Sequence, residues 1–241
     1  MQDIDAVKNR ALDLMRKAGF PILEEIEIAI DEKLPFMGYT TQKNGKPLIV
    51  VSQWGATSEM GFGLVIHELS HIYRTETHHP SHNFALQEKV LQLIFGDKKL
   101  PLYQREIIHG AVNSIQDLYA DDIFFKVFTT DTVDVGDFFL GWIHTPVNGA
   151  SPKSMWTNAS YVVSAAFAQA NLERHSVSDT NGKINNAIED FLRNCLPIMK
   201  EKYVYFKHRM VTLPEKIIEE EFGNLLVAYM QNFLQLTIGE A

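Results

Sequence analysis

The sequence predicts an α+β fold that is mostly helical, with a small N-terminal sheet that is antiparallel or mixed. Three observations lead to this fold class. Isoleucines at 26, 28 and 30 alternate with other residues, which indicates a half-buried strand. An Asn-Gly pair at 44–45 is a strong signal for a tight hairpin. Beyond residue 74, apolar residues recur mainly at helical spacing, and we expect these helices to form a C-terminal bundle.

The N-terminal elements follow in order from the same patterns. We expect a first helix over 4–18, where apolar residues recur every three or four positions and Gly19 supplies a stop. The expected extended segments cover 22–30, 36–41 and 48–52. A turn near Trp54 should lead into a further helix that begins at about residue 60.

The remainder of the chain is predicted to be helical after a polar loop at 75–81. The expected helices cover 82–95, 101–128, 151–172, 181–194, 197–209 and 213–236. Aromatic residues of this part are expected in the core; they include Phe124, Phe125, Phe128, Phe138 and Phe139. No repeat or low-complexity linker interrupts the chain.

Composition and charge narrow the class of protein. The 241 residues are 46% hydrophobic and 22% charged, which is typical of a globular protein with a sizeable core. A formal net charge of −8 argues against a nucleic-acid binder. The polar start and the lack of a long apolar run predict neither a signal peptide nor a membrane span. With Cys195 as the only cysteine, expected to be buried, we predict a cytoplasmic protein without disulfides.

One short motif carries most of the chemical information. Residues 67–71 read His-Glu-Leu-Ser-His, and residues four apart lie on one face of a helix. His67 and His71 can therefore bind one metal ion, with Glu68 beside it as a base. The preceding residues 60–66 are apolar nearly all round, which predicts a buried helix. A buried helix carries such polar groups only where they are paired or bound to metal.

This motif resembles that of the zincin metallopeptidases. The resemblance implies one zinc ion per chain, a peptide or protein substrate, and Glu68 as the general base that activates a zinc-bound water. It also implies a zincin-like arrangement, with residues 1–75 forming the sheet and motif helix and 76–241 completing the cleft within one compact unit. The hairpin around Asn44 would supply an edge strand that pairs with substrate, or it is a plain structural hairpin.

The third ligand is expected from an acidic helix. One zincin family has a glycine and a third histidine where this chain has Arg74 and Thr77, so this chain does not match it. The sequence is more similar to the gluzincins, whose second helix carries Asn-Glu-x-x-x-Asp. Here Asp117 would bind zinc and Asp121, one turn later, would hold the ring of His67. The ligand is Asp where gluzincins have Glu.

Other residues are candidates for the third ligand and for stabilising an oxyanion, and a second function is also consistent with the sequence. Glu88 is the second choice for the third ligand, and Glu106 is less favoured. The candidates for a group that stabilises an oxyanion are His109, Tyr119, His144 and Tyr161. His78, His79 and His82 are expected to belong to a polar loop. The alternative function is a zincin-fold regulatory or protein-interaction module without peptidase activity.

Overall fold

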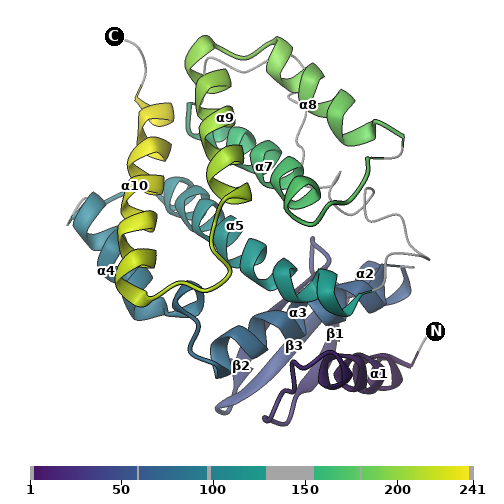
Figure 1. Ribbon diagram of the computed structural model, residues 1–241. Coiled ribbons are helices and arrows are strands. Elements are labelled where there is room, and N and C mark those ends of the chain that lie inside the picture. Colours follow the sequence, from purple (N-terminus) through teal and green to yellow (C-terminus); the bar gives the residue numbers. More distant parts are fainter. Residues whose placement is uncertain (1–2, 59, 97–98, 129–154, 180, 239–241) are drawn as a thin grey trace. The chain divides into compact units, whose positions relative to one another are not determined.

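The computed structural model describes residues 3–58, 60–96, 99–128, 155–179 and 181–238. The described part is mostly helical and contains one three-stranded mixed sheet, which confirms the predicted α+β class (Figure 1). Its contacts group the chain into two compact units. Unit 1 comprises Met1–His82 and Tyr119–Asp134, and unit 2 comprises Asn83–Leu118 and Val135–Ala241. The predicted division at residue 75, within one compact unit, remains a prediction.

The sheet of unit 1 is built from β1 (Glu27–Asp31), β2 (Gly38–Lys43) and β3 (Lys46–Ser52). The strand order is β1-β3-β2, so the apolar strand β3 is central, parallel to β1 and antiparallel to β2. Asn44 and Gly45 both have positive φ, as a type I′ hairpin turn requires. Because β2 pairs with β3 alone among the described strands, it forms one edge of the sheet.

The first strand begins later than expected, at Glu27 instead of residue 22. The reason lies in the hydrogen bonds of the preceding segment. The backbone N–H groups of Leu23 and Glu24 donate to the carboxylate of Glu76, at 3.1 and 2.9 Å, and not to a neighbouring strand. This segment is therefore anchored by a side chain at the end of a helix.

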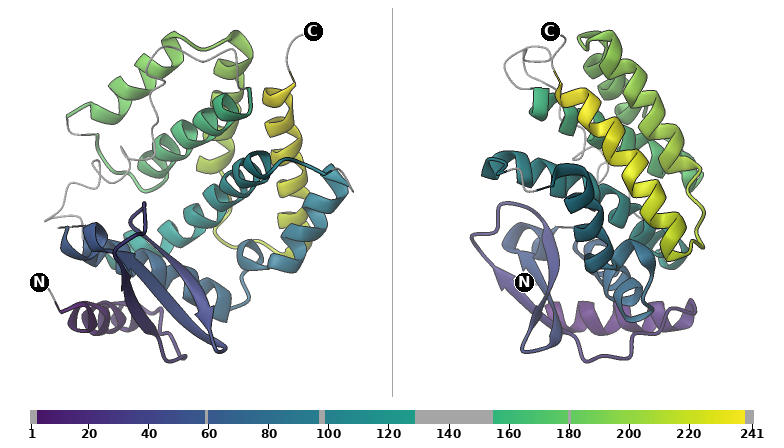
Figure 2. Two further views of the ribbon diagram at one scale, coloured as in Figure 1. Left: turned by 180° about the vertical axis from the view of Figure 1, so that it is seen from behind. Right: turned by 90° about the vertical axis from the view of Figure 1, so that its left-hand side faces the viewer.

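Three helices complete the N-terminal part of unit 1. They are α1 (Ile4–Lys17), α2 (Gln53–Thr57), which replaces the expected turn, and α3 (Gly61–Glu76). Helices α1 and α3 contact each other and the sheet, and Figure 2 shows the strands in front of α3 in its left-hand view. A Cβ atom at Gly61 would lie 2.5 Å from the carbonyl oxygen of Gly55, so α2 and α3 meet backbone to backbone. Most residues of α3 are buried, as predicted.

Unit 2 contains the predicted C-terminal helices. They are α4 (Phe84–Phe95), the first part of α5 (Leu102–Val127), α7 (Met155–Arg174), α8 (Lys183–Arg193), α9 (Pro197–Val211) and α10 (Glu219–Thr237). Helix α10 contacts α4, α7 and α9. It starts later than predicted, after Pro214, and the carboxylate of Glu221 accepts the N–H of Ile218 at its start. The buried Tyr229 of α10 donates to the carbonyl of Ala111 at 3.0 Å.

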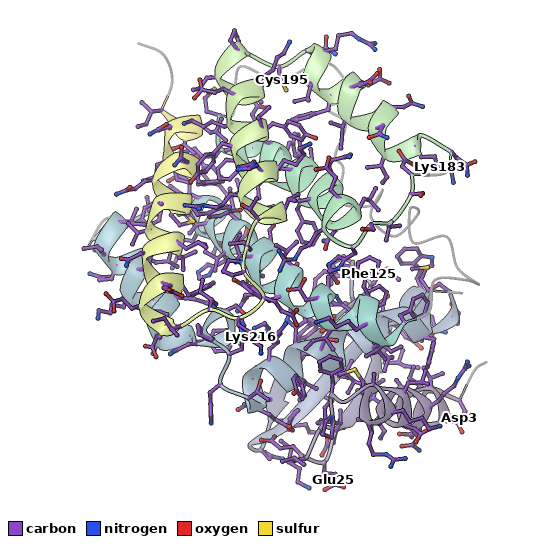
Figure 3. The ribbon with its side chains drawn as sticks, viewed as in Figure 1. Asp3, Glu25, Phe125, Lys183, Cys195 and Lys216 are labelled. Atoms are coloured by element: carbon purple, nitrogen blue, oxygen red, sulfur yellow. The ribbon has the colours of Figure 1, made fainter. Side chains whose placement is uncertain are left out.

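Cys195, Phe124 and Phe128 follow the core prediction, whereas Phe125 is only partly buried. Cys195, labelled in Figure 3 between α8 and α9, is buried, and burial raises the pKa of its thiol to about 11. Phe124 and Phe128 are buried and stack on each other. Phe138 and Phe139 lie outside the described residues. No helix in the described ranges combines the length and apolar character needed to cross a bilayer.

Candidate metal centre

Helix α3 presents the two motif histidines to each other. The Nε2 atoms of His67 and His71 are 3.1 Å apart, and the ring centroids are 4.7 Å apart in an edge-on arrangement. This geometry follows from the four-residue spacing on one helix. His67 is buried and His71 is partly buried. Two ring nitrogens that converge in this way are suited to bind one cation.

Asp121 fixes the orientation of the first histidine. Its Oδ1 atom lies 2.8 Å from Nδ1 of His67, and the Asp121 side chain is fully buried. A carboxylate can only accept here, so Nδ1 of His67 carries the hydrogen and Nε2 presents its lone pair. This is the pairing that the sequence analysis expects for Asp121.

Asp117 supplies an oxygen to the same cluster. One ligand atom each from His67, His71 and Asp117 all lie within 4.8 Å of one another. Asp117 is buried and lies one turn before Asp121 on α5, so both carboxylates occupy one face of this continuous helix. Two nitrogens and one carboxylate oxygen match the ligand set of a catalytic zinc site that keeps one position open.

The distances can be compared with those that zinc requires. Zn–N bonds of 2.0–2.1 Å in a tetrahedron place two ligand nitrogens about 3.3 Å apart. The Nε2 atoms of His67 and His71 are already close to this separation at 3.1 Å. The Asp117 oxygen needs to approach by about 1.5 Å at most to complete a tetrahedral set. The residues present therefore fit a zinc ion.

Glu68, the candidate base, is hydrogen-bonded by a residue of the sheet. The hydroxyl of Thr40 on β2 lies 2.7 Å from Oε2 of Glu68 and 3.2 Å from the backbone oxygen of Glu68. Glu68 itself is only 5% exposed. A buried carboxylate needs such a donor, because its desolvation is otherwise uncompensated. Thr40 is not predictable from the sequence pattern, because its contact depends on how β2 packs against α3.

His82 is a second residue that the sequence analysis did not place at the site. Its Nε2 atom lies 2.8 Å from Nδ1 of His71, although it was expected in a polar loop. His82 belongs to a short 3-10 helix, Pro80–His82, and is 7% exposed. Burial is the main cause that holds the pKa of His82 well below its ordinary value, and the nearby His71 and His79 act in the same direction. In the neutral form that burial favours, His82 can accept a hydrogen bond through one ring nitrogen.

Arg74 and Tyr119 of unit 1 make packing and hydrogen-bond contacts next to the cluster. Arg74 stands where the three-histidine zincins have glycine, and its Nε donates to the carbonyl of Tyr119 at 3.0 Å. Tyr119, a candidate for oxyanion stabilisation, is buried, with its ring beside Arg74 and His79. Helix α3 continues past Arg74 to Glu76, and Thr77 caps its end without contributing a ligand.

The remaining candidates lie elsewhere. Glu88 on α4 and Glu106 on α5 are exposed and do not belong to the metal-binding cluster found among the described residues. His109 is exposed on α5, and Tyr161 is half-buried on α7. His78 is also exposed, and His144 lies outside the described residues.

Comparisons with known proteins identify the family and leave its activity open. The chain belongs to a family described as "Family of unknown function (DUF5781)", which matches residues 10–235. No curated protein is significantly similar to the chain. No solved structure is significantly similar to it either. The geometry of the site is therefore the basis for a function of this chain.

Proposed function

We propose that this protein is a zinc-dependent metallopeptidase with a zincin-like, gluzincin-type site. The observation that supports this most directly is the convergence of His67, His71 and Asp117, next to the buried carboxylate of Glu68. A site that only binds metal for stability needs no base beside its ligands. The retention of Glu68, with its own hydrogen-bond donor, favours a hydrolytic role over a regulatory one.

Each residue then has a defined task. His67, His71 and Asp117 would hold the zinc ion, and Asp121 would keep the Nε2 lone pair of His67 directed at it. When bound, zinc supplies Lewis acidity to a carbonyl and lowers the pKa of water. Glu68 would accept a proton from water at the site and return it to the leaving amine.

Strand β2 supports a peptide as the substrate. It lies at an edge of the described sheet and carries Thr40, which contacts Glu68 directly. An extended peptide can add to such an edge through backbone hydrogen bonds. A peptide paired with β2 would thus lie beside the proposed base, which is where its scissile bond is needed.

The test begins with zinc content. Purified protein should contain about one zinc ion per chain, and a His67→Ala/His71→Ala double variant should contain almost none. Zinc content that is the same in both proteins would exclude the proposed centre. Circular dichroism should show that the double variant is folded, so that loss of metal is not loss of the protein.

Catalysis is tested on a peptide library with wild type and Glu68→Gln. The variant is nearly isosteric, so it should retain zinc, while cleavage should fall about a hundredfold or more because the base is removed. Equal cleavage by both proteins would rule out Glu68 as the base. Stoichiometric zinc without any cleavage by wild type would instead favour the regulatory or protein-interaction module.

A further inference from the structure

We propose that His82, Ser81 and His79 form a hydrogen-bonded chain that fixes the ring tautomer of His71, which makes His82 a positioning residue of the metal centre. This inference depends on the proposed function, because a fixed tautomer matters only if His71 is a ligand. All four residues belong to unit 1. His82 would play for His71 the part that Asp121 plays for His67.

The chain consists of short contacts between buried or partly buried groups. Nδ1 of His71 lies 2.8 Å from Nε2 of His82, and Nδ1 of His82 lies 2.8 Å from Oγ of Ser81. The same Oγ is 2.7 Å from Nδ1 of His79, which also accepts the backbone N–H of Ser81 at 3.3 Å. Ser81 and His82 are buried, so these contacts satisfy polar groups that water does not reach.

The backbone N–H of Ser81 indicates the direction of the bonds at His79 and Ser81. A backbone N–H can only donate, so Nδ1 of His79 is an acceptor and carries no hydrogen. The Ser81 hydroxyl therefore donates its single hydrogen to His79 and accepts from Nδ1–H of His82. Nε2 of His82 faces Nδ1 of His71 at 2.8 Å, so it would accept the Nδ1–H of His71 when Nε2 of His71 binds a metal ion.

With a cation bound between the two rings, the assignment of hydrogens is consistent along the whole chain. His71 would carry its hydrogen on Nδ1, and its Nε2 lone pair would face the cation shared with Nε2 of His67, which lies 3.1 Å away. Asp121 imposes the same tautomer on His67. Both rings are thus held with their lone pairs directed at one point. Pre-orientation of this kind by groups behind the ligands raises metal affinity.

The loop after α3 brings His82 back to the motif. Beyond the helix, His78 adopts a positive φ, and the N–H of His79 donates to the carbonyl of Arg74 at 2.8 Å. The N–H of His82 donates to the carbonyl of His79 at 2.9 Å. The ring of His79 packs on Tyr119, with centroids 4.7 Å apart. The loop is therefore positioned by a backbone bond to α3 and by ring packing against Tyr119 of α5.

The first experiment measures zinc dissociation constants by competition with a chromophoric chelator. Ser81→Ala removes the acceptor of His82 without altering either histidine, and His82→Leu removes the acceptor of His71. We expect both to weaken zinc binding by about tenfold to a hundredfold. His82→Gln, which retains an acceptor, should recover most of the affinity.

Ser70→Ala is the matched control. Ser70 is also a buried serine near the motif, but its hydroxyl donates to the carbonyl of Ile66 at 2.8 Å. We expect this variant to bind zinc within about threefold of wild type, since backbone-directed bonds of this kind do not orient a ligand. If Ser81→Ala binds zinc as Ser70→Ala does, the inference is wrong. Loss of binding in His82→Leu as complete as in His71→Ala would also overturn it, by making His82 a ligand.

The second experiment needs no activity. Two-bond ¹H–¹⁵N spectra of the zinc-loaded protein distinguish the two tautomers of each imidazole, and the His82→Gln variant identifies the signals of His82. Wild type should show His82 with its hydrogen on Nδ1, directed at Ser81, and Ser81→Ala should show a mixture of tautomers at His82. A hydrogen on Nε2 of His82 in wild type would refute the chain. If wild type binds no zinc, the proposed function fails, whereas zinc binding with the wrong tautomer of His82 overturns this inference alone.

Discussion

Substitution of Asp121 by Asn tests how much the negative charge beside His67 would contribute to zinc binding at the proposed metal centre. Asn has nearly the same volume, and its amide oxygen can still accept the Nδ1–H of His67 across the 2.8 Å contact. What is lost is the charge. A hydrogen bond to a charged group contributes about 1.5–3 kcal/mol and a neutral one about 0.5–1.5 kcal/mol. The expected loss is therefore about 1–1.5 kcal/mol, or about fivefold to twelvefold in zinc affinity.

Competition with a chelator at pH 7 measures this change, and circular dichroism shows whether the variant is folded. Asp122→Asn is the control, because Asp122 is also a buried acid on α5 and its carboxylate lies 4.0 Å from the guanidinium of Arg74. We expect Asp122→Asn to change zinc affinity by less than about twofold. Equal effects of the two substitutions would refute the specific role of Asp121. An unchanged affinity in Asp121→Asn would show that its charge is unimportant.

Two other substitutions test the third ligand and the contact to the base. Asp117→Ala should weaken zinc binding by more than about a hundredfold, because it removes the proposed third ligand. Glu88→Ala, on the exposed face of α4, should leave the zinc dissociation constant unchanged. A larger effect of Glu88→Ala than of Asp117→Ala would make Glu88 the ligand. Thr40→Val removes the 2.7 Å donor to Glu68 and should lower kcat/KM for peptide cleavage by about tenfold to a hundredfold, while Thr40→Ser should retain most of it. Equal rates for the valine and serine variants would show that the hydroxyl does not position the base.

Local sequence patterns predicted most of the secondary structure. The Asn44-Gly45 hairpin and the buried motif helix were both predicted from a few neighbouring residues, because turn type and helix periodicity are local properties. The predicted helix at 101–128 is observed as Leu102–Val127. The largest differences are at the starts of β1 and α10. There, contacts outside the local pattern, such as the bond from Leu23 to Glu76, determine where an element begins.

The same distinction applies to the candidate site. His67 and His71 share a helix, as do Asp117 and Asp121, so spacing alone predicts that each pair shares a face. Thr40 and His82 are different, because their contacts depend on strand packing and on the path of a loop. No periodicity connects position 40 with 68, or 82 with 71. The available sequence signal was the density of histidines just after the motif, which does not indicate which of them returns to it.

The last turn of α3 limits which residues could serve as ligands in the proposed metal centre. Arg74 is bonded to α5, and Glu76 anchors the segment that leads into β1. A third histidine at position 77 would have to leave the helix near Arg74 to reach the metal, which would remove both anchors. In the proposed metal centre, a single substitution would therefore not exchange the acidic ligand for a histidine without loss of stability. These two anchors of α3 favour the carboxylate of Asp117 as the proposed third ligand.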